Sequence, residues 1–239
     1  MKILVLIISL IPAFAYSQVS TKITAVTNYI SRGVSFSNGG SSYASAGLPV
    51  VQGSLDYAVG DFSASLFTSS IDSINLGTYA IEKDTEIDYI LNYSKKVNSD
   101  LTLGASATHY SFMRNDNDAT TAESINAMYS FARVDLAYTR NYSGLQTSMT
   151  YTLLSLFFPV SEKLMFSTAL GRTSWDDESK VGMSSYNDYK VSLRMTISPS
   201  IEAEMAYTNT YGRKDLVVTQ QEIKTDKALT FSISSSFGL

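Results

Sequence analysis

The chain has 239 residues, and its 18 Lys and Arg against 22 Asp and Glu give a net charge of −4. This mild acidity, with no basic patch along the chain, argues against a nucleic-acid partner. Cysteine is absent from the sequence, which excludes disulfides and thiol chemistry. No cofactor is predicted.

A secretory signal is the first predicted element. Lys2 precedes an apolar run from Ile3 to Leu10, and small residues follow. The run is too short for the alternative, an uncleaved membrane anchor. Cleavage is predicted after Ala15 or Ser17, so that residues 1–17 are the signal peptide and residues 18–239 form a single domain.

Apolar and polar residues alternate along the rest of the chain, in segments of about ten residues separated by turn residues, which predicts β-strands. In "TEIDYILNYS" (85–94), Ile87, Tyr89 and Leu91 alternate with Glu86 and Asp88. The same pattern recurs in residues 50–59, 186–197, 201–210 and 227–239. One face of each strand is apolar and the other is polar, as in a soluble sandwich or in a transmembrane barrel.

The connections between the predicted strands favour the barrel. Long polar connections are expected at 34–48, 72–83, 114–121, 175–183 and 212–224, and short ones at 60–61, 95–100, 130–132, 159–163 and 198–200. The short connection at 143–144 is the exception. Alternating short turns and long loops are typical of outer-membrane barrels. We therefore expect an all-β fold, a transmembrane antiparallel β-barrel of 12 strands with both termini periplasmic, and with Pro159 and Pro199 in short turns.

Aromatic residues and the C-terminus agree with a location in the bacterial outer membrane. Tyrosines are expected on the lipid-facing surface near strand ends, where amphipathic rings favour the membrane interface; these are Tyr29, Tyr57, Tyr93, Tyr129, Tyr138, Tyr189 and Tyr207. The last strand places Phe231, Ile233, Phe237 and Leu239 on one face. We expect outer-membrane lipid as one partner and, through this terminal strand, the barrel-assembly machinery as another.

Two short motifs resemble a known family. "TNYISRGVS" (27–35) is similar to the first-strand signature S-D-Y-x-x-R-G-x-S of the TorF-like porins, with Asn28 in place of the usual Asp. "QGSLDY" (52–57) is similar to the Q-G-x-x-D-Y strand that follows it in that family. Weaker similarities lie at 86–89, around Glu123 and around Asp188. The resemblance implies an outer-membrane channel and leaves the solute open.

Arg32 is expected to face the lumen near the outer mouth, because it lies on the opposite face of the predicted strand from Tyr29. An arginine on the lipid side would cost about 2–4 kcal/mol near the midplane. Gly33 is expected to let the strand kink as it leaves the barrel.

Alternation also predicts which polar residues line the lumen and set its selectivity. They are Arg32, Gln52, Asp56, Glu86, Asp88, Glu123, Arg133, Asp135, Asp188, Lys190, Arg194, Glu202 and Glu204. Acids exceed bases in this set, which predicts a mildly cation-leaning channel for small solutes or ions. The alternative is a non-conducting barrel of structural or adhesive function.

Local geometry predicts one specific contact and leaves one strand open. A hairpin turn at Ser198-Pro199 brings Arg194 opposite Glu204 or one pair away, and we expect an ion pair there. The alternative is that both side chains extend independently into lumen water. The strand that contains Leu153, Leu154, Leu156, Phe157 and Phe158 is apolar on both faces, so its orientation is ambiguous.

Catalysis and metal binding are not predicted. His109 and Ser111 share a strand face and leave lipid hydrolysis as a remote alternative, but no residue is placed to orient the imidazole. Residues 115–118 and Glu123 resemble a calcium loop only faintly, because the glycine and the spacing of an EF-hand are missing. A solvated outer loop is expected there.

Overall fold

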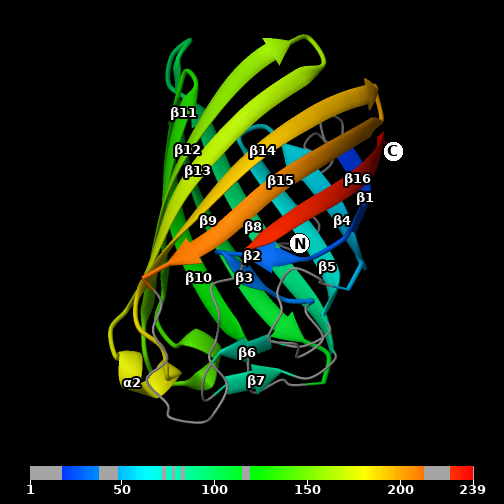
Figure 1. The fold of residues 1–239 in the computed structure, drawn as a ribbon. Helices are drawn as coiled ribbons and strands as arrows, with labels where there is room; N and C mark the ends of the chain where they lie inside the picture. The colour runs from blue at the N-terminus through cyan, green and yellow to red at the C-terminus, as the bar shows by residue number, and fades with distance from the viewer. Residues whose placement is uncertain are drawn as a thin grey trace, which may run out of the picture.

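Twelve antiparallel strands close into a barrel in the computed structural model, which describes residues 18–37, 48–71, 74–76, 79–81, 84–114, 119–212 and 227–238 (Figure 1). The strands are β1 (Gln18–Val26), β4 (Val50–Val59), β5 (Phe62–Ile71), β8 (Asp84–Lys96), β9 (Leu101–Phe112), β10 (Thr120–Tyr129), β11 (Ala132–Thr139), β12 (Met149–Ser161), β13 (Leu164–Trp175), β14 (Tyr186–Ser198), β15 (Ile201–Tyr211) and β16 (Ala228–Gly238). The predicted twelve-stranded antiparallel barrel is confirmed.

The barrel closes where its first strand pairs with its last. Ser20 lies opposite Gly238 and Val26 opposite Ser232, while the other edge of β1 pairs with β4. Every other barrel strand pairs with its neighbours in chain order. The start of β1 and the end of β16 therefore lie at the same end, which we call the short-turn end.

The connections have different lengths at the two ends of the barrel. Short turns join β4 to β5, β8 to β9, β10 to β11, β12 to β13 and β14 to β15. The opposite, long-loop end carries two small hairpins, β2 (Ile30–Ser31) with β3 (Val34–Ser35) and β6 (Ile74–Leu76) with β7 (Tyr79–Ile81), and two short helices, η3 (Tyr142–Gly144) and α2 (Glu178–Val181). In Figure 1 this end points down. No helix of the described residues is long and apolar enough to cross a bilayer.

Two predicted connections differ from the structure. The expected short turn at 143–144 is part of a longer connection, 140–148, in which Ser143 has a φ of 47° and begins a tight turn. This loop restores the strict alternation of short turns and long loops. Pro159 lies within β12 instead of in a turn, beside a register shift that spares it a ladder hydrogen bond. Pro199 lies in the turn between β14 and β15 as predicted.

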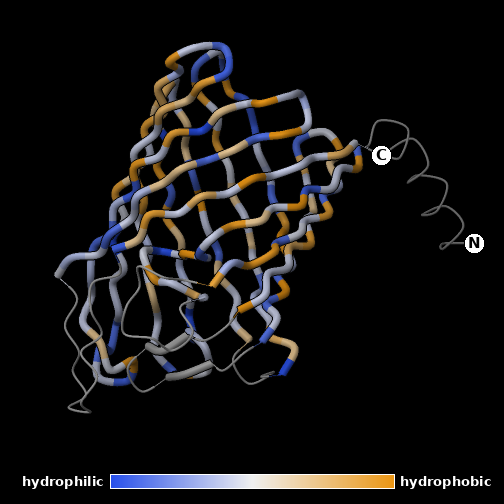
Figure 2. The backbone as a smooth tube through the Cα atoms, turned by 45° about the vertical axis from the view of Figure 1, so that its right-hand side comes forward, coloured by the Kyte–Doolittle hydropathy of each residue, from blue (hydrophilic) through white to orange (hydrophobic). Residues whose placement is uncertain are grey.

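The outward face of the barrel is apolar, as the alternation predicts. Leu91 is 63% exposed and Ile125 is 61% exposed, whereas Glu86 and Asp88 on the opposite face of their strand are 2% and 5% exposed. Figure 2 shows the alternation of hydrophobic and hydrophilic residues along the strands. Such an outward face is typical of barrels that span a membrane.

The strand with two apolar faces takes its orientation from its neighbours. In β12, Leu154 lies opposite Val134, which is 48% exposed on the outward face. Leu154, Leu156 and Phe158 therefore face outward. Met149, Tyr151, Leu153 and Phe157 face the lumen.

The predicted pairing of Arg194 with Glu204 is confirmed. The two residues are register partners in β14 and β15, and Arg194 Nη2 lies 3.0 Å from Glu204 Oε2. Lys190 Nζ bonds to the other carboxylate oxygen of Glu204 at 2.5 Å. Glu204 thus joins two bases on the inward face of one strand.

Substitution of Leu91 by arginine is expected to destabilise the barrel in lipid. Leu91 is outward and near the middle of β8, where burying a guanidinium in hydrocarbon costs about 2–4 kcal/mol. Urea unfolding in lipid vesicles, followed by heat-modifiable gel mobility, measures the loss. The matched control is Asn92→Arg on the inward face of the same strand. Equal losses in the two variants would contradict the assignment of the faces.

A double-mutant cycle of Arg194→Ala and Glu204→Ala is expected to give a coupling of about 0.2–1 kcal/mol, because the pair is partly exposed to lumen water. Arg194→Ala alone is expected to cost less than Glu204→Ala, since Lys190 continues to hold the carboxylate. Unfolding free energies of the four proteins measure the cycle. Strictly additive losses would show that the contact does not stabilise the barrel.

Candidate functional site

The β2–β3 hairpin is the feature around which the candidate site is built. Arg32 and Gly33 form its two-residue turn, with φ values of 49° and 74°. Positive φ at both positions is the geometry of a type I′ turn, which Gly adopts without strain. The prediction that Gly33 lets the strand kink out of the barrel is wrong: β1 ends at Val26, and Gly33 lies at the tip of a separate hairpin.

Polar contacts at the base of the hairpin fix its conformation. The side-chain oxygen of Asn28 accepts hydrogen bonds from the hydroxyls of Ser35 (2.6 Å) and Ser37 (3.0 Å). The Tyr29 amide donates to Ser37 Oγ, and the Phe36 amide donates to the Tyr29 carbonyl. Asn28 thus holds the two arms of the hairpin together.

The hairpin crosses the lumen from one wall to the other. The hairpin is part of the connection between β1 and β4, which are adjacent in the wall. β12 lies half-way around the ring of strands from them. Arg32 Nη1 contacts Met149 Sδ of β12 at 3.7 Å, and Arg32 Nη2 donates to Tyr110 Oη of β9 at 3.2 Å. Tyr186 of β14 donates its hydroxyl to the Arg32 carbonyl at 3.1 Å. The lumen is therefore obstructed at this level.

The tip of the hairpin is packed directly against the wall. A Cβ atom on Gly33 would lie 2.5 Å from Thr210 Cγ2 and 2.6 Å from Asp188 Cβ. Nonbonded carbon atoms do not approach a Cβ this closely, so no side chain fits at this position. Gly33 is required both by its backbone conformation and by the close approach of β14 and β15.

Arg32 is surrounded by aromatic rings and carboxylates of the barrel wall. Its guanidinium carbon lies 5.7 Å from the ring centre of Tyr110 and 5.6 Å from that of Tyr151, within cation–π range. The guanidinium also interacts electrostatically with the buried carboxylates that β8 and β14 contribute, which are Glu86, Asp88 and Asp188. Arg32 thus lies at the tip of the hairpin, among side chains of β9, β12 and β14.

An apolar cluster covers the hairpin at the long-loop end. Val34 of β3 belongs to it, together with the wall and loop residues Ile71, Phe112, Met149, Trp175, Val181, Met183 and Tyr186. Val181 and Met183 come from the loop that contains α2 and are fully buried. Asp177 caps α2 by accepting from the Ser179 hydroxyl and amide, which lowers the pKa of its carboxyl group.

Tyr142 packs into the same cluster from the loop between β11 and β12. Its ring meets that of Trp175 edge to face, with centres 4.9 Å apart. Burial raises the pKa of Tyr142 to about 12, so the phenol stays neutral at physiological pH. The cluster that covers the hairpin on this side is thus made of uncharged groups.

A chamber of about 360 Å³ lies on the other side of the hairpin. Asn28, Tyr29 and Ile30 of the hairpin segment line it. The wall strands β1, β4, β5, β14, β15 and β16 contribute Thr24, Val26, Gln52, Phe67, Lys190, Glu204, Thr208, Thr230 and Ser232. Its one lysine and one glutamate are paired with each other. The lining is otherwise mostly hydroxyl, amide and aromatic groups.

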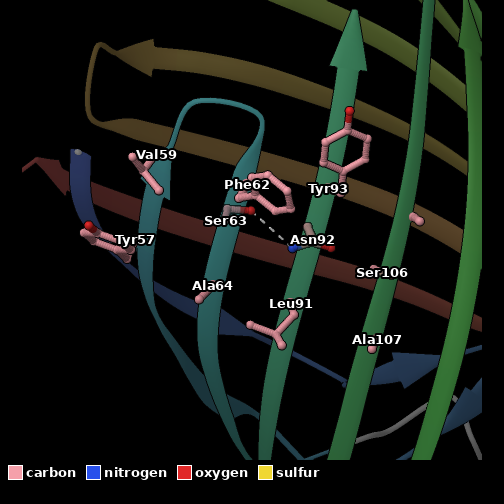
Figure 3. A pocket seen from close by; sticks show the side chains of 11 residues that line it. Tyr57, Val59, Phe62, Ser63, Ala64, Leu91, Asn92, Tyr93, Ser106 and Ala107 are labelled. Carbon is pink, nitrogen blue, oxygen red and sulfur yellow. Dashed lines mark hydrogen bonds between the residues drawn. The ribbon is translucent and has the colours of Figure 1, made fainter. Parts of the chain in front are cut away.

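A second hollow, of about 420 Å³, lies in the wall formed by β4, β5, β8 and β9 (Figure 3). The large side chains of Phe62, Leu91 and Tyr93 flank the small ones of Ala64 and Ala107. Phe62 and Leu91 are more than 60% exposed, so this groove belongs to the apolar outer surface.

Most of the predicted lumen residues lie on the inward face. Arg133 pairs with Asp135 at 2.6 Å, and Lys190 and Arg194 pair with Glu204. Gln52, Asp56, Glu86, Asp88, Asp188 and Glu202 also have the inward phase of their strands. Arg32 enters the lumen on the hairpin instead of on a barrel strand.

The prediction that Glu123 lines the lumen is wrong. It lies opposite Tyr138, which is 42% exposed, and two residues from the outward Ile125, so it faces away from the lumen. Ser124 and Asn126 take the inward positions of β10. Small residues lie on both faces of this segment, so the alternation of apolar and polar residues does not show which face Glu123 is on.

Among the described residues, Lys22 and Asp84 are inward charged residues that the sequence analysis did not name. Lys22 shares the inward face of β1 with Thr24 and lies 3.7 Å from Glu202. Asp84 shares the phase of Glu86 in β8, is 8% exposed, and accepts hydrogen bonds from the Arg114 amide. The alternation of residues in β1, in which Lys22 is next to the outward Ile23, could have predicted that Lys22 faces inward. Acids still outnumber bases after these corrections.

The prediction that Tyr29 lies on the lipid-facing surface is also wrong. Its ring lies inside the barrel, 5.1 Å from the ring centre of Phe36 and 6.4 Å from that of Phe67, and its hydroxyl is hydrogen-bonded to the Glu86 carboxyl. Tyr93, Tyr129, Tyr138 and Tyr207 are exposed on the outward face as predicted, and Tyr57 and Tyr189 share the outward phase.

His109 and Ser111 do not contact each other through a hydrogen bond. His109 Nδ1 lies 3.0 Å from Thr121 Oγ1, and the Ser111 hydroxyl donates to the Ile87 carbonyl. In the part of the chain that the structure describes, no group of His, Cys, Asp or Glu could hold a metal ion. The faint calcium-loop pattern at 115–118 lies outside the described residues.

Comparisons with known proteins agree with this geometry. Residues 13–237 match Gcw_chp, a family described as bacterial proteins of unknown function. No curated protein matches the chain. The family match covers most of the chain.

Solved structures with a similar fold include several porins. The KdgM porin has a TM-score of 0.55 at 10% identity, with 91% of this chain and 99% of that one covered. The NanC porin has a TM-score of 0.55 at 11% identity, covering 92% and 100%, and an outer-membrane channel from Pseudomonas putida F1 has 0.53 at 11%, covering 92% and 95%. The chain therefore belongs to the Gcw_chp family of bacterial proteins of unknown function, and its fold is that of outer-membrane porins.

Proposed function

We propose that this protein is a channel of the bacterial outer membrane through which small solutes or ions diffuse, and that its β2–β3 hairpin closes it at rest. The observation that carries the proposal is a closed barrel with an apolar outward face and a charged inward face. Its similarity in fold to porins supports the same function.

The cellular setting is part of this proposal. The signal-like residues 1–17 support export, and the alternation of short turns and long loops supports a periplasmic short-turn end with both termini. The apolar groove on the outer wall supports contact with lipid acyl chains. Phe231, Ile233 and Phe237 are about half exposed on the outward face of β16, which supports recognition by the barrel-assembly machinery. The arginine–glycine and QGSLDY motifs support a narrower kinship with the TorF-like porins.

The lumen is proposed to favour cations. Lys22, Arg133, Lys190 and Arg194 are each within ion-pair distance of an acid, whereas Glu86, Asp88 and Asp188 share the single cation Arg32. Surplus fixed charge of one sign in a narrow region sets the ion preference of a pore. The proposed activity is passive transport and involves no catalysis.

A non-conducting barrel is the second candidate function. It is favoured by the filling of the long-loop end, where the hairpin and the apolar cluster meet. Planar-bilayer conductance of the purified protein and of a variant with a displaced hairpin separates the two functions. Conductance in the variant alone supports a closed channel, and conductance in neither supports the structural barrel.

Gly33→Ala is expected to displace the hairpin and increase conductance. The added Cβ collides with Thr210 and Asp188, and the left-handed backbone alone costs about 1–2 kcal/mol for Ala. A bias of about 2 kcal/mol shifts the closed–open equilibrium about 30-fold. Gly60→Ala is the matched control, because Gly60 has a φ of 58° with no atom within 4 Å of the added Cβ. If the two variants conduct alike, the hairpin is not the closing element.

The cation preference is expected to depend on the two acids of β8. In the Gly33→Ala background, Glu86→Gln and Asp88→Asn should each lower the cation-to-anion permeability ratio, because each removes an inward negative charge. Reversal potentials in a salt gradient measure the ratio. Glu123→Gln removes the same charge from the outward face and should leave the ratio unchanged. Anion preference in the Gly33→Ala protein would overturn the sign of the proposed selectivity.

A further inference from the structure

The surroundings of Arg32 have the composition of a receptor for an organic cation. The rings of Tyr110 and Tyr151 lie within 6 Å of the guanidinium carbon. Tyr110 Oη also accepts a hydrogen bond from Arg32 Nη2. Glu86 Oε2, Asp88 Oδ1 and Asp188 Oδ2 are buried oxygens without a hydrogen-bond partner among the described residues. Unpartnered buried carboxylate oxygens are costly. Asp188 Oδ2 packs against Gly171 of the wall, so Glu86 Oε2 and Asp88 Oδ1 are the two oxygens that indicate capacity for further donors.

The groups that surround Arg32 belong to the barrel and not to the hairpin. Glu86 and Asp88 come from β8, Tyr110 from β9, Tyr151 from β12 and Asp188 from β14. Each of these strands is hydrogen-bonded on both sides in the closed sheet. Tyr151 is oriented by donating its hydroxyl to Asp188 Oδ1 at 3.3 Å. The backbone that carries these five side chains therefore stays in place when the hairpin is elsewhere, and groups held on rigid strands lose little affinity to reordering.

We propose that the barrel wall carries a binding site for guanidinium-type organic cations, and that in this structure Arg32 of the hairpin occupies it. The inference builds on the proposed function, since it names the solute class that the lumen recognises. A planar guanidinium matches the site because it stacks on aromatic rings and presents several donors to carboxylates at once. A solute of this class competes with Arg32, so its binding displaces the hairpin that obstructs the lumen.

The test uses Arg32→Gly, which empties the site and preserves the turn. Gly favours the positive φ that Arg32 adopts at 49°, so the hairpin backbone is retained. Trp175 is the only tryptophan of the chain and lines the same hollow as Arg32, so its fluorescence reports occupancy without any need for conductance. Methylguanidinium at millimolar, non-denaturing concentration is the probe, and urea is the uncharged control of similar shape.

Methylguanidinium is expected to change Trp175 fluorescence in Arg32→Gly saturably, and urea is expected to have no effect. Asp88→Asn in the same background should weaken binding about tenfold, because it removes a charged hydrogen-bond acceptor. Glu123→Gln, on the outward face, should not weaken it. The unaltered protein should need a higher concentration, since Arg32 competes.

An equal response to urea, an equal response of the unaltered protein, or no response in folded Arg32→Gly would each overturn the proposal. Heat-modifiable gel mobility shows that the variants are folded, and Arg32→Ala serves as a second variant if Arg32→Gly does not assemble. Saturable binding in a protein that never conducts would refute the proposed channel while leaving the site intact. Conductance that methylguanidinium does not alter, together with an unchanged fluorescence, would refute the site alone.

Discussion

Closure of the sheet is the constraint on which the rest of this structure depends. In hydrocarbon no water satisfies backbone N–H and C=O groups, so a sheet that spans a membrane can leave no edge unpaired. Here the pairing of β1 with β16 removes both edges. Once the sheet is closed, alternate residues of every strand must face either the outside or the lumen, and the apolar set takes the outside. The charged residues are thereby gathered into one enclosed space, where Glu204 joins Lys190 and Arg194.

The enclosed space is too wide for the wall side chains alone to fill, and the β2–β3 hairpin fills its long-loop end. Side-chain packing is tight at this end. Gly171 illustrates this, because a Cβ at this position would lie 2.3 Å from Asp188 Oδ2 and 2.4 Å from Tyr151 Oη. The missing side chain lets the Asp188–Tyr151 pair lie against β13, and Asp188 is also the residue at which Gly33 meets β14. At the short-turn side of the hairpin the chamber remains open, so the two ends of the lumen differ in both polarity and packing.

The features that the sequence predicted correctly depend on residues close together in the chain. The strand count, the outward apolar face and the contact of Arg194 with Glu204 follow from alternation and from one tight turn. Tyr29 was placed on the lipid side because local alternation appears to continue the first strand. Its actual position is decided by Phe67 and Glu86, which are far away in the chain. The prediction for Glu123 was wrong for another reason. Its orientation is set by the register of β10 with β11, and the small residues on both faces of β10 give no local pattern that reveals this register.

The identity of the residue before Gly33 has a physical reason that alternation could not reveal. Type I′ turns favour Asn, Asp or Gly at both central positions, and another residue in the left-handed region costs about 1–3 kcal/mol. Arg32 adopts this region with a φ of 49°. Its contacts with the Tyr110 and Tyr151 rings, and its electrostatic interactions with Glu86, Asp88 and Asp188, offset the strain only while the guanidinium remains near them. The strain and the charge recognition are therefore coupled: a change that weakens the hold on the guanidinium also weakens the hairpin turn, so the position of the hairpin responds to the electrostatics of the wall.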